Sequence, residues 1–133
     1  MTPEIKIAAL CDHAIVGQDG KLSMLGIFRN ISVSQLPAQH PRMYLVAVLA
    51  LDPGAHDVTV RLTKPDGGAA MAEDPHIQVR SVPGQDVNVI VELNNLGFTS
   101  YGLHRFDLDV DGMTVGSLPV AISAITASSS RQN

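Results

Sequence analysis

The sequence contains no tryptophan, only 4% aromatic residues and a single cysteine, Cys11. So few aromatic side chains argue against a carbohydrate-binding platform, which stacks sugars on exposed rings. One cysteine cannot form an internal disulfide, which predicts a reducing compartment. No apolar run approaches the roughly 20 residues of a membrane-spanning helix, and the segment from Met1 to Lys6 does not resemble a secretory signal. We therefore expect a cytoplasmic protein that does not span a membrane.

Charged residues are also scarce, at 17% of the chain, with 9 Lys and Arg against 13 Asp and Glu and a net charge of −4. A nucleic-acid partner is not expected, because such proteins carry a basic stripe. Hydrophobic residues make up 45% of the 133 residues, which is enough to build the core of one domain. Because so few charges remain to cover the surface, an exposed apolar patch that binds another protein is expected.

Hydrophobic residues alternate with polar ones along most of the chain, and Val, Ile and Thr are frequent. This period of two predicts strands, and no segment has a helical period. The sequence predicts an all-β fold, an antiparallel two-sheet sandwich of about eight strands with an immunoglobulin-like or C2-like layout. Residues 1–126 are expected to form this single domain, and the Ser-rich residues 127–133 a flexible tail.

Three local features refine this expectation. The segment 21–35 is apolar on both faces in its middle, which is typical of a central strand or of a strand that bends and changes sheets, with Gly26 as the bending point. Residues 36–41 contain two prolines and are predicted to be a crossing loop. Asp111 and Gly112 form the clearest two-residue hairpin signal.

The same hairpin carries the pattern D-x-D-x-D-G, formed by Asp107, Asp109 and Asp111, which matches the first half of a calcium loop. The complete loop needs a glutamate at the position occupied by Leu118. Strand alternation explains the pattern without a metal, since it turns Asp107 and Asp109 toward water. No metal and no cofactor are therefore expected. The alternative is a C2-like module that binds calcium or lipid head groups through these aspartates and the loops near Asp19 and Asp52.

Cys11, Asp12 and His13 are the residue types of a nucleophilic site. On a strand, however, Cys11 and His13 share a face roughly 6–7 Å apart and Asp12 points the other way. We expect a core cysteine beside a histidine at a strand end. The remaining histidines lack metal-ligand spacing and are expected to be solvated or structural: His40, His56, His76 and His104. No catalytic residue is predicted, so we do not expect an enzyme.

Five arginines fall on separate predicted strands and could converge on one outer face: Arg29, Arg42, Arg61, Arg80 and Arg105. Ion pairs with carboxylates on neighbouring strands are the favoured interpretation, each worth at most about 1 kcal/mol. Contact with an anion or with a protein is the alternative.

With these residues in view, the chain resembles a family of small bacterial proteins of unknown function. The shared segments begin with 9–14 (ALCDHA), 20–22 (GKL), 25–28 (LGIF) and 36–41 (LPAQHP), and continue with the turn 64–67 (KPDG) and the segment 118–120 (LPV). The resemblance implies one β-rich domain in a bacterial cytoplasm. It implies no activity, ligand or catalytic residue.

Together these features predict a non-enzymatic β-sandwich that acts by protein–protein contact, through a protein partner or by assembling with copies of itself as a homo-oligomer. The calcium- or lipid-binding module is the alternative.

Overall fold

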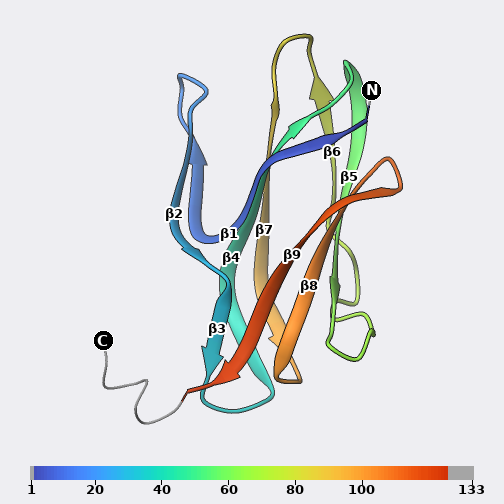
Figure 1. The fold of residues 1–133 in the computed structure, drawn as a ribbon. Coiled ribbons are helices and arrows are strands. Elements are labelled where there is room, and N and C mark those ends of the chain that lie inside the picture. The colour runs from blue at the N-terminus through green and yellow to red at the C-terminus, as the bar shows by residue number, and fades with distance from the viewer. Residues whose placement is uncertain (1, 126–133) are drawn as a thin grey trace.

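In the computed structural model, which describes residues 2–125, nine β-strands form two sheets packed face to face (Figure 1). The strands are β1 (Glu4–Val16), β2 (Leu22–Phe28), β3 (Asn30–Val33), β4 (Ala38–Ala50), β5 (Gly54–Thr63), β6 (His76–Ser81), β7 (Val87–Phe98), β8 (Gly102–Val110) and β9 (Met113–Ala124). The predicted all-β two-sheet sandwich is confirmed, with nine strands instead of eight. No helix capable of crossing a membrane occurs in this range. The predicted tail, 127–133, lies outside the described residues.

One sheet has four strands in the order β2-β1-β4-β7, and the other has five in the order β3-β9-β8-β5-β6. Every pairing is antiparallel except that of β3 with β9, which is parallel. The parallel pair departs from the predicted antiparallel sandwich. It arises because β3 enters the second sheet from the end of β2 instead of through a hairpin turn.

Alternating residues of both sheets fill the space between them. Leu45, Ala47 and Leu49 of β4 meet side chains of β5 such as Val60, and all of these are essentially inaccessible to solvent. Burying each Val or Leu side chain contributes about 1.5–3 kcal/mol relative to leaving it exposed. This continuous core explains why the period of two is so regular along β5, β7 and β8.

The segment predicted to be one long strand or a strand that changes sheets does change sheets. β2 ends at Phe28 in the four-stranded sheet, and β3 begins at Asn30 beside β9. The crossing takes place at Arg29, whose carbonyl accepts a hydrogen bond from the backbone N–H of Ala121 (2.9 Å). Gly26 does adopt a positive φ of 71°, but it bends the hairpin described below rather than moving the chain between sheets.

The prediction that residues 36–41 form only a loop is wrong in part, because β4 begins at Ala38 and includes Pro41. The pairs His40–Leu96 and Arg42–Asn94 flank the proline on the β7 side. On the other side, pairing with β1 begins only at Tyr44. This end of β4 is therefore locally an edge, where proline is tolerated.

Candidate interaction site

β1 and β2 form a hairpin that folds back over the outer face of the four-stranded sheet. β1 pairs with β4 only as far as Cys11, opposite Tyr44, and beyond this point it pairs with β2 alone. Figure 1 shows β1 reversing its direction partway along its length, so that the hairpin runs alongside the sheet. A second apolar cluster fills the space beneath it and consists of Cys11, Ala14, Tyr44 and Val46 with Leu22, Met24 and Ile90. This cluster anchors the hairpin to the sandwich.

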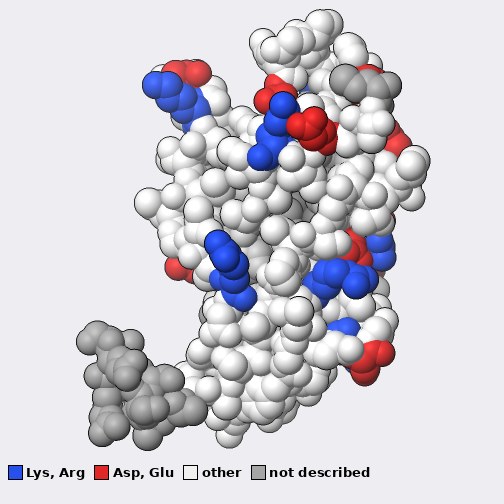
Figure 2. Space-filling view, viewed as in Figure 1, with Lys and Arg blue, Asp and Glu red and all other residues white. Residues whose placement is uncertain are grey.

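The opposite side of the hairpin is exposed and uncharged. It consists of Ile15, Ser23 and Leu25, which share a face by the β1–β2 register, and of Ile27, which is exposed although its partner Cys11 is buried, and we call it the hairpin face. His13, the partner of Leu25, lies at the border of this face, because its ring meets Tyr44. Leu25 is 65% exposed, Ile27 58% and Ile15 52%. Three of the ten large exposed hydrophobic residues in the described range lie on this face, and these are the three just named. Figure 2 shows few charged side chains over β2 below the tip of the hairpin. The expected apolar patch therefore lies here.

β2 is also an edge strand, since it pairs only with β1. Natural sheets protect their edges with lysines, prolines or covering segments, because unpaired backbone groups bind other strands. β2 has neither lysine nor proline between Leu22 and Phe28. The hairpin face thus continues into an unprotected sheet edge.

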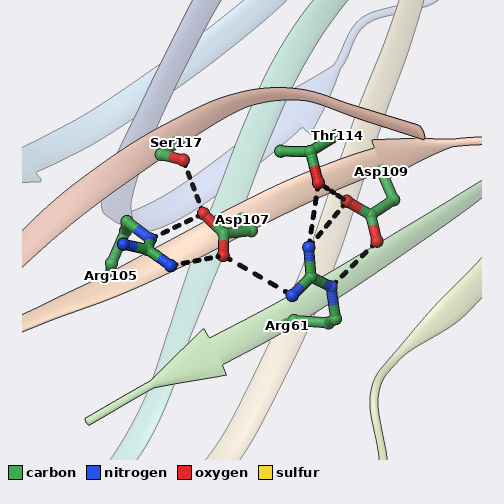
Figure 3. A network of polar contacts seen from close by, with 6 residues as sticks. All are labelled: Arg61, Arg105, Asp107, Asp109, Thr114 and Ser117. Atoms are coloured by element: carbon green, nitrogen blue, oxygen red, sulfur yellow. Dashed lines mark hydrogen bonds and ion pairs between the residues drawn. The ribbon is translucent and has the colours of Figure 1, made fainter. Parts of the chain in front are cut away.

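Two of the five arginines lie on the outer face of the five-stranded sheet in a polar network (Figure 3). Arg61 of β5 donates hydrogen bonds to both carboxylate oxygens of Asp109, at 2.8 and 3.0 Å. Arg105 donates to both oxygens of Asp107, at 2.8 and 3.2 Å. Arg61 Nη1 lies 3.6 Å from Asp107, so it links the two pairs. The interpretation of these arginines as cross-strand ion pairs is confirmed for Arg61, which reaches from β5 to Asp107 and Asp109 of β8. Arg105 also forms an ion pair, but with Asp107 of its own strand.

Two hydroxyl groups of β9 complete the network: Thr114 donates to Asp109 (2.7 Å), and Ser117 donates to Asp107. Burial acts to raise the pKa of Asp107, but its bonds to Arg105 and Ser117 hold that pKa below the ordinary value. The hydrogen bond from Arg61 lowers the pKa of Asp109. Both carboxylates are therefore ionised and already neutralised by arginines.

These contacts decide where the calcium-loop aspartates lie. The prediction that Asp107 faces water is wrong: it lies on the outer face, but Arg105, Ser117 and Arg61 cover it, leaving 3% of it exposed. Asp109 is partly buried against Arg61, and Asp111 lies at the hairpin tip with His56. Within residues 2–125, no three His, Cys, Asp or Glu residues form a group suited to a metal ion.

His56 of β5 connects the loop between β4 and β5, which contains Asp52, to the β8–β9 turn. Its Nδ1 lies 2.7 Å from Asp111 Oδ2, and its Nε2 lies 2.7 Å from the carbonyl oxygen of Asp52. The other Asp111 oxygen accepts the backbone N–H of Asp57 (2.9 Å). Two acceptors around one imidazole favour its doubly protonated form, and the hydrogen bond to Asp111 raises the pKa of His56. As predicted, Asp111 and Gly112 form the turn, both with positive φ.

The fold should therefore be more stable in mildly acidic than in basic solution. Because the pKa of His56 is raised by folding, protonated His56 adds to the free energy of unfolding. This contribution is complete below about pH 6.5, the pKa in the unfolded chain, and it is lost as the pH rises through the pKa in the folded protein. Urea unfolding at several pH values between 5 and 9 measures this. His56→Gln should flatten the profile, and Asp111→Asn, which tolerates the same turn, should do so too. An unchanged profile in both variants would contradict this role.

The structure separates the three residues of the Cys11, Asp12 and His13 motif. Cys11 is fully buried in the second apolar cluster, whereas Asp12 and His13 are exposed. Burial raises the pKa of the Cys11 thiol, which keeps it protonated. The His13 ring instead meets the edge of Tyr44, with the ring centroids 5.9 Å apart. This arrangement suits packing and not nucleophilic chemistry.

The other histidines lie apart from one another. The His40 ring lies beside Phe28 at a tilt of 44° (5.8 Å between centroids), and His76 Nε2 lies 3.4 Å from Asp57 Oδ1. His104, expected to be solvated or structural, is wholly buried against Phe98, and its Nε2 has no hydrogen-bond partner among the described residues. Its alternation with Phe106 was the sequence signal for this placement.

The fold and these contacts define a β-sandwich protein with an exposed hairpin and an ion-paired outer face. Residues 6–123 match the model of a family described as "Family of unknown function (DUF6941)", and the chain belongs to this family. This confirms the resemblance drawn from the sequence. No curated protein matches the chain in sequence.

Several solved structures share the fold. A β-glucosidase from Listeria innocua, in complex with glucose, is similar over 92% of this chain with a TM-score of 0.53 and 14% identity. This chain spans only 16% of that enzyme. An immunoglobulin-like protein from Pseudomonas aeruginosa is similar over 92% of this chain and 97% of its own (TM-score 0.48, 10% identity). A DNA glycosylase from Pseudomonas fluorescens is similar over 88% of this chain and 30% of its own, with a TM-score of 0.49 and 16% identity. At such identities the glucosidase supports the sandwich fold alone, and the two scores below 0.5 establish nothing further.

Proposed function

We propose that the protein is a non-enzymatic β-sandwich module that acts by protein–protein contact, and that its contact surface is the hairpin face with the open edge of β2. The observation that carries this proposal is the concentration of exposed apolar side chains on one uncharged surface, led by Leu25 and Ile27. Contiguous patches of this kind usually mark interaction sites.

The occupant we propose is a second copy of the chain. A two-fold interface brings the same patch together with itself. Two chains with a net charge of −4 repel each other, but the hairpin face carries no charged residue, so this is where two copies meet without facing like charges. Antiparallel pairing of two β2 edges would also satisfy their free backbone groups.

Light scattering coupled to gel filtration tests the proposal. The unmodified protein should form a dimer, and Leu25→Glu should weaken it by about a hundredfold or more, because a buried unpaired charge costs several kcal/mol. Leu103→Glu is the matched control, since Leu103 is 62% exposed but lies on β8. It should leave the dimer intact.

Thermal unfolding of Leu25→Glu must show that the monomer is folded. A strictly monomeric unmodified protein at high micromolar concentration would overturn the proposal. So would a dimer that dissociates with Leu103→Glu but not with Leu25→Glu.

A further inference from the structure

We infer that the seam between the two sheets, on the side where β1 and β9 meet, binds a medium-chain carboxylate. A groove of about 300 Å³ opens there and is lined by Ala8, Ala9, Leu10, Ile27, Phe28, Arg29, Leu118 and Pro119. Small-ligand sites begin at about this volume and are mostly apolar with few polar groups. Apart from Arg29, every lining side chain is apolar.

Small residues stand where the two sheets approach each other, with Ala8 and Ala9 on β1 and Gly116 on β9. Ala8 and Leu118 line both the groove and a smaller apolar cavity beneath it, next to Gly116. A Cβ at Gly116 would lie 2.4 Å from Ile5 Cδ1, so the absence of a side chain there accommodates Ile5. Leu10, a buried residue of the main core, also lines the groove, so the groove has an apolar floor that suits an alkyl chain.

Arg29 supplies the charge that an anionic head group requires. Arg61 and Arg105 are occupied by aspartates, but none of the ion pairs formed within residues 2–125 includes Arg29. It is exposed at the junction of β2 and β3 and lines the groove. A guanidinium group binds a carboxylate through two parallel hydrogen bonds. An apolar groove with one unpaired arginine therefore fits a carboxylate on a short alkyl chain.

Calorimetric titration with octanoate tests this inference. Octanoate should bind with a stoichiometry of one, and hexanoate about sixteenfold more weakly, because each lost methylene reduces the affinity about fourfold. Arg29→Gln should weaken octanoate about tenfold or more but leave octan-1-ol unaffected, whereas Arg29→Lys should recover part of the affinity. Arg80→Gln, which alters an exposed arginine of β6, should bind octanoate as the unmodified protein does.

Backbone amide chemical shifts locate the ligand. Changes on adding octanoate should centre on residues 8–10, 27–29 and 118. Because Ile27 belongs both to the groove and to the hairpin face, the measurement is repeated with Leu25→Glu, whose monomer shows whether octanoate binds without the dimer proposed above. Absence of saturable binding, shifts centred elsewhere, or equal octanoate affinity in Arg29→Gln would each overturn the inference.

Discussion

Simultaneous replacement of Arg61 and Arg105 by alanine should lower the free energy of unfolding by about 1–3 kcal/mol, because Asp107 loses both arginines and Asp109 loses its partner, while water reaches Asp107 where the arginines covered it. Asp107 is only 3% exposed and faces both arginines. Asp107 remains paired as long as one arginine is present, so the two single replacements should together cost less than the double replacement. Arg61→Ala should cost more than Arg105→Ala, because it also leaves Asp109 without its arginine. Urea unfolding of the two single variants and the double variant measures the coupling.

The control for this prediction is the carboxylate itself. Asp107→Asn should destabilise the unmodified protein, because it removes two ion pairs. In the double variant it should be stabilising, because there it removes a carboxylate that has lost both of its arginine partners. Arg80→Ala, an exposed arginine without an ion pair among the described residues, should change stability by less than about 0.5 kcal/mol. Strict additivity of the two arginine replacements would show that they act independently on Asp107.

The same network sets the response to acid. Pairing lowers the pKa values of Asp107 and Asp109, so the ionised carboxylates add to the free energy of unfolding. This contribution is present above about pH 3.9, the pKa in the unfolded chain, and it is lost as the pH falls through the pKa values in the folded protein. The stability difference between the unmodified protein and the double variant should therefore narrow between pH 6 and pH 3. A constant difference would mean that the carboxylates do not carry the effect.

The sheets and the last turn could be predicted from sequence because their signals are local. Side chains alternate across a strand, so Val58, Val60 and Leu62 reveal a core-facing side without further information. Asp111 and Gly112 likewise specify a turn by their own backbone preferences.

The candidate surfaces could be predicted only in part, because they depend on what covers a face. Alternation placed Asp107 on the outer side correctly, but it could not show that Arg61, distant in sequence, would cover it. The composition indicated an apolar patch without locating it. Its position depends on the fold-back of the β1–β2 hairpin, which partly buries Met24 and leaves Leu25 exposed.

Gly26→Ala should detach this hairpin from the sheet and cost about 2 kcal/mol. The left-handed conformation of Gly26, with φ of 71°, costs an alanine roughly 1–2 kcal/mol. Its Cβ would also lie 2.5 Å from Asp12 Oδ2, so the carboxylate must move. Gly67→Ala is the matched control, because its φ is 92° and nothing lies within 4 Å of the new Cβ.

Cys11 reports the detachment directly, since the hairpin and Tyr44 bury it. A thiol reagent reacts with a buried cysteine only when the structure opens locally. A loss of 2 kcal/mol confined to the hairpin raises the labelling rate about 30-fold. Gly67→Ala, which strains the turn after β5, should leave the rate nearly unchanged. Equal labelling in both variants would show that Gly26 does not hold the hairpin against the sheet, and the hairpin face would then lack the fixed geometry that a dimer interface needs.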